Sequence, residues 1–202
     1  MLRIGHRGAA ALAPQNTIES MRAALDAGVD MIEFDVSPGL VVAHDPGRPG
    51  PRLDAFLNEL VSLLPGDVEL MVDLKATGYE LATLEKCRRA GLLDRCLFAT
   101  GERSSIRVLQ GKVRTSFSFS RGSPGRALPL LRLTVGDVWR RSGADDATVR
   151  HTLITPRLID VVHHREGRVF AWTVNTAEGV ARMRALGVDG VISDDPRLLN
   201  EG

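Results

Sequence analysis

The chain has 202 residues, of which 44% are hydrophobic and 25% charged, and this is the composition of a single soluble globular domain. It excludes an intrinsically disordered chain, a collagen-like fibre and a coiled coil. Since 26 Lys and Arg residues stand against 25 Asp and Glu residues, the net charge is +1, and no overall charge attracts nucleic acid or an anionic membrane.

The two cysteines, Cys87 and Cys96, do not have metal-binding spacing, and they argue against a disulfide-rich secreted module. The first residues lack the basic and apolar regions of a signal peptide. No stretch approaches the roughly 18 consecutive apolar residues of a membrane span. The sequence therefore predicts a soluble, cytoplasmic protein with no nucleic-acid partner and no stable membrane association.

Short apolar segments alternate with longer amphipathic segments through the first half of the chain. The first predicted helix begins at Asn16, with Glu19 completing a capping box, and ends at Gly28. Pro65 and Gly66 end the second helix. The predicted strands are 2–5, 31–36, 68–74 and 95–99, and the predicted helices are 16–27, 53–64 and 79–90.

The same alternation continues through the second half. A helical stretch over 123–142 is expected to be interrupted at Pro129 and Gly136, and Thr155 followed by Pro156 begins a later helix. The remaining predicted helices are 104–110, 155–166 and 176–186, and the remaining predicted strands are 113–119, 149–154, 169–174 and 188–193.

About eight strands that alternate with helices indicate parallel strands with helical crossovers. Such a chain folds either as a closed (β/α)₈ barrel, the TIM barrel, or as an open doubly wound sheet. Neither a G-x-G-x-x-G sequence after the first strand nor a Walker motif is present, which disfavours the nucleotide-binding open sheets. We therefore expect one compact α/β domain over residues 1–202, folded as a TIM barrel.

Acidic residues interrupt two of the apolar strands. Because side chains alternate along a strand, Glu33 and Asp35 share one face of the 31–36 strand, and Asp73 shares a face with Lys75 in the next strand. Carboxylates gathered at neighbouring strand ends repel one another and need a cation. An all-oxygen cluster suits Mg²⁺ or Ca²⁺, and the alternative interpretation is a structural ion-pair network with Lys75 and Arg7.

Two histidines stand where loops leave the same ends of the strands. His6 follows the first strand, and His44 follows the short extended segment over 40–43. A lone loop histidine is more often solvated than catalytic. Two of them beside acidic strands are typical of a general acid/base pair at the face where barrel enzymes carry their active sites.

Several motifs, in this order and spacing, resemble those of glycerophosphodiester phosphodiesterases. The resemblance extends from residue 1 to about 197 and is weakest between about 100 and 150. The motifs are Gly5-His6-Arg7-Gly8, Pro14-Gln15-Asn16-Thr17, the segment 27–36, Val41-Val42-Ala43-His44-Asp45, Asp73-Leu74-Lys75, Trp172-Thr173-Val174-Asn175 and the segment 187–194.

The resemblance implies a metal-dependent hydrolase that converts glycerophosphodiesters into glycerol phosphate and an alcohol, with a small-molecule phosphodiester as its substrate. It implies one divalent cation, Mg²⁺ or Ca²⁺, and His/His acid–base catalysis. Carried over position by position, the implied catalytic residues are His6 and His44, the substrate-binding residues are Arg7, Lys75 and Trp172, and the metal ligands are Glu33, Asp35 and Asp73.

The sequence departs from the family pattern in four places. Asp73 and Gln15 each stand where the family usually has Glu. The segment between Asp35 and His44 is shorter than usual, and only residues 46–51 stand where the family carries a small insertion. These departures predict a more open site and a change in the placement of His44.

Trp172 is expected near the glycerol by resemblance, whereas strand alternation groups it with Phe170 and suggests packing beneath the helices. Two other functions are considered. One is a phosphodiesterase of the same barrel type that acts on lysophospholipids or sphingomyelin-like lipids. The other is a degenerate, non-catalytic barrel that binds phosphate esters.

Overall fold

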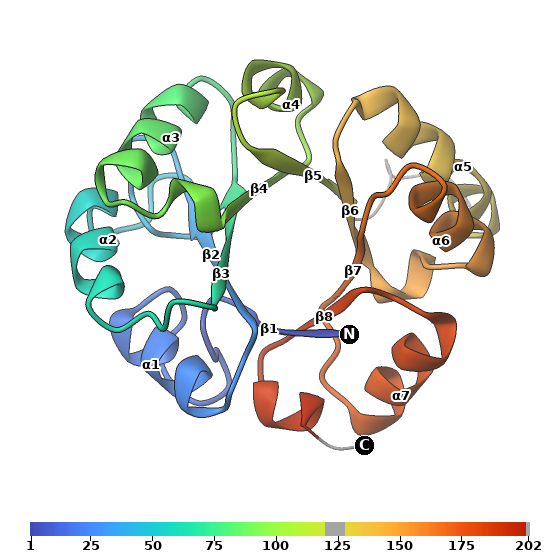
Figure 1. The fold of residues 1–202 in the computed structure, drawn as a ribbon, viewed down its shortest axis with the longest axis horizontal. Coiled ribbons are helices and arrows are strands. Elements are labelled where there is room, and N and C mark those ends of the chain that lie inside the picture. The colour runs from blue at the N-terminus through green and yellow to red at the C-terminus, as the bar shows by residue number, and fades with distance from the viewer. Residues whose placement is uncertain (120–127, 201–202) are drawn as a thin grey trace.

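The computed structural model describes residues 1–119 and 128–200, and in these residues eight parallel strands close into a barrel (Figure 1). Each strand pairs with its successor, and β8 pairs with β1. The strands are β1 (Leu2–Gly5), β2 (Met31–Val36), β3 (Glu69–Leu74), β4 (Cys96–Thr100), β5 (Arg114–Phe119), β6 (Asp146–Arg150), β7 (Val169–Trp172) and β8 (Gly190–Ser193). The predicted TIM barrel is confirmed.

The helices form a ring outside the strands (Figure 1). None of those described is long and apolar enough to cross a membrane. The α-helices are α1 (Ile18–Asp26), α2 (Leu53–Val61), α3 (Glu80–Arg89), α4 (Arg103–Leu109), α5 (Leu128–Ser142), α6 (Pro156–His163) and α7 (Ala177–Leu186), and the short 3₁₀ helices are η1 (Leu93–Arg95), η2 (His151–Leu153) and η3 (Pro196–Leu199).

The start of α1 differs from the prediction. The N-cap is Thr17, whose side chain accepts from the backbone N–H of Ser20 while the Ser20 hydroxyl accepts from the N–H of Thr17. The prediction of Asn16 and Glu19 as the capping pair was therefore wrong. Asn16 lies outside the helix in the left-handed region, at φ 60°, and its side chain donates to Asp35 instead.

Two predictions in the second half also need correction. The helix α5 continues through Gly136, and Pro129 lies in its first turn, where a backbone N–H has no helical partner to lose. The predicted residues 123–127 of this helix lie outside the described part of the chain. The predicted strand 149–154 is also wrong at both ends: β6 spans Asp146–Arg150, and His151–Leu153 form η2. The acidic residue at its start is tolerated because the buried Asp146 carboxylate pairs with Arg114 and Arg168.

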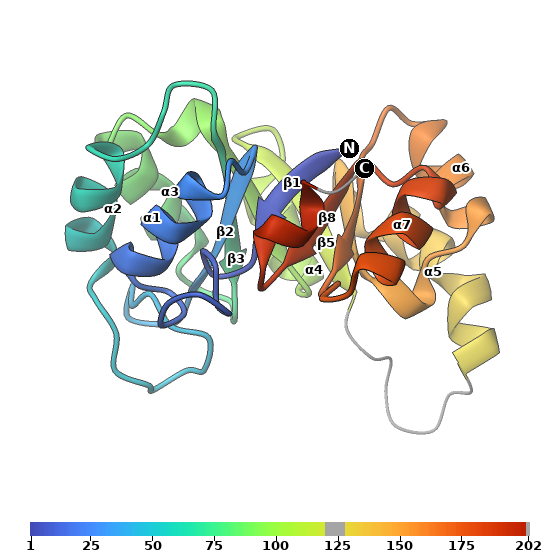
Figure 2. The same cartoon turned by 90° about the horizontal axis from the view of Figure 1, so that it is seen from below.

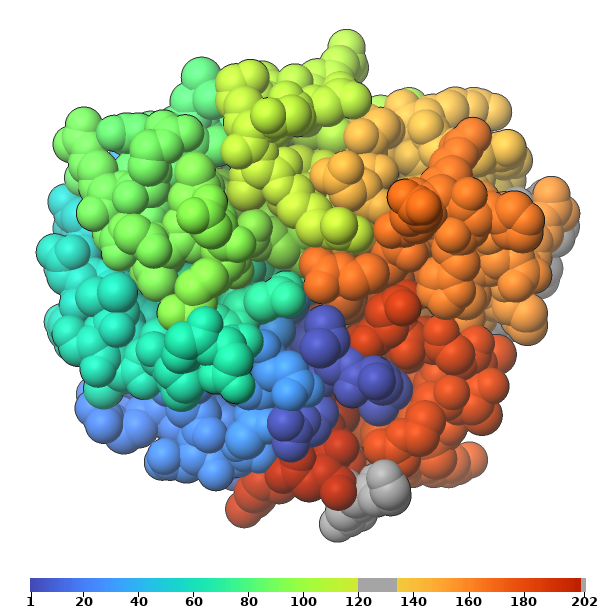
Figure 3. Space-filling model, in the orientation of Figure 1, coloured from blue at the N-terminus to red at the C-terminus, as the bar shows by residue number. Residues whose placement is uncertain are grey.

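Side-chain alternation divides the apolar residues between two regions. Along β2, Ile32, Phe34 and Val36 point outward and pack against the helices, and Phe34 contacts Phe56 of α2 with 5.2 Å between ring centroids. The inward residues fill the barrel interior, and they are Ile4, Met31, Met71, Leu97, Ala99, Phe170 and Ile192. Atoms cover the barrel centre in the space-filling view (Figure 3).

The two ends of the barrel differ in chemistry. At the end where the strands begin, Glu69 pairs with Arg168, whose guanidinium lies over the ring of Phe170. The loop that joins β2 to α2 lies at the opposite end, away from the N-terminus (Figure 2). The acidic and histidine residues singled out in the sequence lie at this carboxyl end, the end where barrel enzymes bind their substrates.

Candidate active site

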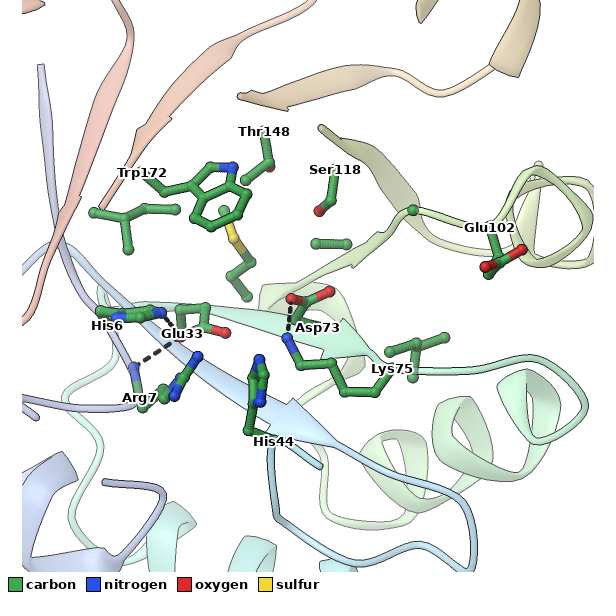
Figure 4. Close-up of a pocket in the computed structure, with 15 residues that line it drawn as sticks. His6, Arg7, Glu33, His44, Asp73, Lys75, Glu102, Ser118, Thr148 and Trp172 are labelled. Atoms are coloured by element: carbon green, nitrogen blue, oxygen red, sulfur yellow. Dashed lines mark hydrogen bonds and ion pairs between the residues drawn. The ribbon is translucent and has the colours of Figure 1, made fainter. Parts of the chain in front are cut away.

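A cavity of about 280 Å³ opens at the carboxyl ends of the strands (Figure 4). Every predicted site residue except Asp35 lines it, and Asp35 lies fully buried behind the lining. The predicted residues in the lining are His6, Arg7, Glu33, His44, Asp73, Lys75 and Trp172. Residues separated by most of the chain are therefore brought into one site.

The tight turn after β1 places His6 and Arg7. The His6 backbone N–H donates to the Ser193 carbonyl at 2.9 Å, which ties the turn to β8. Gly8 has a φ of +84°, and a Cβ there would lie 2.5 Å from the Ser20 carbonyl carbon. Glycine is required at this position because a side chain would be strained by the backbone and would collide with α1.

Three carboxylates converge beside this turn. Asp35 of β2 and Asp73 of β3 are register partners, and Glu33 precedes Asp35 on the same inward face. One oxygen from each lies within 4.8 Å of the others. The Asp73 carboxylate therefore stays in the cluster even though its side chain is shorter than that of the glutamate usual in the family.

Cations compensate part of this charge. The Lys75 ammonium lies 2.5 Å from Asp35 Oδ1 and 2.6 Å from Asp73 Oδ2, and Arg7 Nε lies 3.0 Å from Asp35 Oδ2. Asn16 also donates to Asp35 at 2.9 Å. Burial opposes ionisation of Asp35, but the charges of Lys75 and Arg7 hold its pKa below the usual value.

Glu33 is the carboxylate that this network leaves uncompensated. Its side chain accepts from the backbone N–H of Arg7 at 2.7 Å, but in the described part of the chain no Lys or Arg side chain pairs with it. Burial first, and then the charge of Asp35, raise the pKa of Glu33 well above its usual value. Burial likewise raises the pKa of Asp73, with Asp35 adding to the effect and Lys75 opposing it.

The ion-pair network alone therefore leaves the cluster with excess negative charge. The donor set consists of carboxylate oxygens, which suit a hard divalent cation such as Mg²⁺ or Ca²⁺. Glu33, Asp35 and Asp73 are close enough together to contact one ion. The residues present thus fit one divalent cation.

Side-chain hydrogen bonds to the backbone fix the segments that carry Lys75 and His44. Tyr79, the N-cap of α3, accepts from the backbone N–H of Lys75 at 3.0 Å and donates to the Val36 carbonyl at 2.7 Å. The buried Ser37 hydroxyl donates to the Ala43 carbonyl, one residue before His44. The shortened loop therefore still brings His44 into the cavity lining.

Trp172 lies inside the barrel mouth, so the prediction that it packs beneath the helices was wrong. Phe170 and Trp172 point inward, and Ala171 faces the outer helices. Ala171 is fully buried in the hydrophobic cluster between the strands and the outer helices. Trp172 Nε1 is buried and has no hydrogen-bond partner among the described residues, which leaves a donor in the cavity wall.

Sequence reasoning missed several residues that support the site. Gln15 accepts from Arg7 Nη1 at 2.6 Å, and Asn16 holds Asp35 rather than capping a helix. Asp194 Oδ1 lies 2.5 Å from His6 Nδ1. Asp194 stands in a motif quoted above, but strand alternation carries no signal for a residue that lies after a strand.

The chain is similar to known proteins over most of its length. The model of the glycerophosphoryl diester phosphodiesterase family matches residues 6–59 and 70–198. A glycerophosphodiester phosphodiesterase of Caldanaerobacter subterraneus is 25% identical over 242 residues, covering 98% of this chain and 96% of the relative.

Solved structures show the same fold. The glycerophosphodiester phosphodiesterase of Thermotoga maritima has a TM-score of 0.72 at 20% identity, covering 98% of this chain and 97% of its own. A phosphodiesterase of Oleispira antarctica, solved in complex with the product sn-glycerol-3-phosphate, has a TM-score of 0.72 at 18% identity, covering 98% and 96%.

Proposed function

The chain belongs to the glycerophosphoryl diester phosphodiesterase family, whose members are phosphoric diester hydrolases, and we propose that it hydrolyses glycerophosphodiesters to glycerol phosphate and an alcohol. One observation carries the proposal. Two histidines, two cationic side chains and two carboxylates of the acidic cluster, Glu33 and Asp73, line the same cavity at the carboxyl end of the barrel (Figure 4). The glycerol phosphate bound by the Oleispira antarctica phosphodiesterase supports the same product here.

The phosphodiester would bind between the acidic cluster and the cations. Glu33, Asp35 and Asp73 would hold one divalent cation, which when bound neutralises phosphoryl oxygens and polarises the phosphorus centre. Lys75 and Arg7 line the cavity beside the cluster and would hold the remaining phosphoryl oxygens. Arg7 is oriented for this task because Asp35 and Gln15 both bind its guanidinium.

His6 and His44 would divide the proton transfers. One imidazole removes the proton from the attacking hydroxyl, which belongs to water or to the glycerol of the substrate, and the other donates a proton to the oxygen of the departing alcohol. Attack by the glycerol hydroxyl would give a cyclic phosphate, which water then opens to glycerol phosphate. Both rings line the cavity, and each has a carboxylate at its Nδ1 atom. Each ring is thereby oriented to use its Nε2 atom on the substrate.

The size of the cavity supports a small alcohol group. Its volume of about 280 Å³ is slightly below the range of about 300–1,000 Å³ that is typical of small-molecule sites. Ser118 and Thr148 place hydroxyl groups in the wall opposite the acidic cluster. The Thr148 hydroxyl is bonded to Ser116, whereas the Ser118 hydroxyl would be available to a polar alcohol group such as that of a glycerophosphodiester.

The test begins with protein stripped of metal by a chelator. Release of the alcohol, choline or ethanolamine, is measured from glycerophosphocholine, glycerophosphoethanolamine and lysophosphatidylcholine as Mg²⁺ or Ca²⁺ is restored. We expect metal-dependent turnover of the two glycerophosphodiesters and little turnover of the lysolipid. Faster turnover of the lysolipid would favour the lipid-directed alternative, and binding of phosphate esters without turnover under any condition would favour the binding barrel.

A further inference from the structure

We propose that Asp194, braced by Asn175, is a positioning residue that holds His6 in one tautomer. The inference rests on the proposed role of His6 in proton transfer. Asp194 follows β8 and Asn175 follows β7, so both lie at the carboxyl end of the barrel beside the turn after β1. The three residues form one chain of hydrogen bonds that ends at the imidazole.

The contact with His6 determines which ring nitrogen carries the proton. Asp194 Oδ1 lies 2.5 Å from Nδ1, and His6 is the first cause of the lowered pKa of Asp194. A carboxylate only accepts hydrogen bonds, so Nδ1 must be the donor. This leaves Nε2 for the cavity, on the side where it lies 4.0 Å from Glu33 Oε2.

Asn175 determines how the Asp194 carboxylate is held. Its Oδ1 accepts from the Ser193 hydroxyl at 3.1 Å and from the backbone N–H of Asp194 at 3.0 Å. Because both donors face Oδ1, the amide group is oriented with Nδ2 toward Asp194 Oδ2, to which it donates. The carboxylate is therefore bound on both oxygens, one by Asn175 and the other by His6.

His44 has no comparable support. Its Nδ1 lies 2.7 Å from Oδ1 of the adjacent residue Asp45, and the two side chains are 41% and 54% exposed. The corresponding values for His6 and Asp194 are 15% and 30%. Besides His44, only the exposed Arg48 pairs with Asp45 in the described part of the chain. The structure therefore assigns rigid positioning to His6.

This geometry predicts the effect of Asp194→Asn. The new amide faces two partners, and Asn175 can only donate to it. Its oxygen must therefore turn toward Asn175, and its NH₂ group toward His6 Nδ1. Nδ1 then becomes an acceptor, which moves the ring proton to Nε2. The fold and the steric volume stay nearly the same while the tautomer inverts.

A second substitution should reverse this inversion. In the double variant Asp194→Asn/Asn175→Asp, the carboxylate at position 175 still accepts from Ser193 and from the backbone of residue 194. It also accepts from the NH₂ group of the new amide at position 194, and the oxygen of that amide is then free to accept from His6 Nδ1. The net charge of the pair and the number of hydrogen bonds are the same as in the wild type.

The experiment combines kinetics with ¹⁵N NMR of the imidazoles at about pH 9, where an ordinary histidine is neutral. In Asp194→Asn we expect kcat to fall on the order of 10²–10⁴-fold with KM little changed, since a wrong tautomer removes proton transfer rather than binding. We expect the His6 proton to move from Nδ1 to Nε2. The double variant should regain the Nδ1–H signal and most of kcat.

Asp195→Asn is the matched control, because it removes the same charge one residue away and Asp195 pairs with Arg197. Its activity should match that of the wild type. The inference is overturned if Asp194→Asn keeps the Nδ1–H tautomer, or if the control loses as much activity. It is also overturned if the double variant recovers neither signal nor kcat.

Two further variants separate the possible failures. If Asp194→Asn does not fold, Asn175→Ala is used, because it keeps the Asp194 carboxylate and removes the amide that braces it. We expect a smaller fall in kcat for this variant. An unchanged kcat would contradict the bracing role of Asn175. If His6→Ala turns over substrate at the wild-type rate while Asp194→Asn inverts the tautomer, the positioning stands and the proposed catalytic role of His6 fails.

Discussion

Glu33→Gln should make the metal-free protein more stable and remove most of its response to metal. The Glu33 side chain is buried, and burial together with Asp35 and Asp73 raises the pKa of its carboxyl group. Glutamine has nearly the same shape and can still accept from the backbone N–H of Arg7. The substitution therefore removes an uncompensated buried charge while retaining the hydrogen bond.

The expected shifts in Tm follow from the expected changes in the free energy of unfolding and from the length of the chain. Removing a destabilising feature of a functional site typically stabilises a protein by about 0.5–2 kcal/mol. In a chain of this size each kcal/mol shifts Tm by about 2–4 °C, so metal-free Glu33→Gln should melt about 1–8 °C above the metal-free wild type. A cation at about 100 times its Kd adds about 2.7 kcal/mol to the wild type, which corresponds to about 5–11 °C.

The assay is thermal unfolding in chelator and again with excess Mg²⁺ or Ca²⁺, at several pH values. Folding raises the pKa of the Glu33 carboxyl group. Such a group lowers the stability of the folded state as pH rises from the pKa of the unfolded chain, about 4.3 for Glu, through the raised pKa of the folded state. The advantage of Glu33→Gln in chelator should therefore vanish at low pH and grow toward neutral pH. A variant less stable than the wild type at neutral pH, or one stabilised equally by metal, would refute the reasoning.

His6→Ala and His44→Ala should each lower kcat about 10²–10⁴-fold, and the double variant should be little slower than the slower single variant; near-native rates in both would exclude acid–base catalysis by these residues. A diester with a very good leaving group should rescue only the variant that lacks the general acid, which kinetics on matched substrates would identify. Asn16→Ala should lower the free energy of unfolding by about 1–3 kcal/mol, measured by chemical denaturation, because it leaves the backbone N–H of Asp35 without its partner. Trp172→Phe should leave stability unchanged or slightly higher and should raise KM, since it removes a buried donor that has no partner among the described residues; an unchanged KM would show that Nε1 does not bind substrate.

The barrel and the acidic cluster could be predicted from the sequence because both depend on local regularities. The alternation of strands with helices restricts the chain to a few parallel architectures. The alternation of side chains places Glu33 with Asp35 on one face, and Asp73 on the corresponding face of the next strand. Since these faces are polar and the opposite faces aliphatic, the pattern also indicates which face points into the barrel.

The same rule failed where neither face of a strand was polar. In β7, alternation groups Phe170 with Trp172 and sets them opposite Ala171, but it does not say which group points inward. The tertiary structure decides this through packing, because large rings fill the barrel interior while the small Ala171 meets the outer helices. Trp172 enters the cavity for that reason.

The partners of individual side chains were likewise decided only by tertiary structure. Asparagine is a common helix N-cap residue. The Asn16 side chain binds Asp35 instead, because the loop after β1 brings it beside β2. His6 and Asp194 are 188 residues apart in the chain, and they meet because β8 pairs with β1 when the barrel closes. A periodic pattern describes neighbours along one strand, whereas this contact exists only once the first and last strands lie side by side.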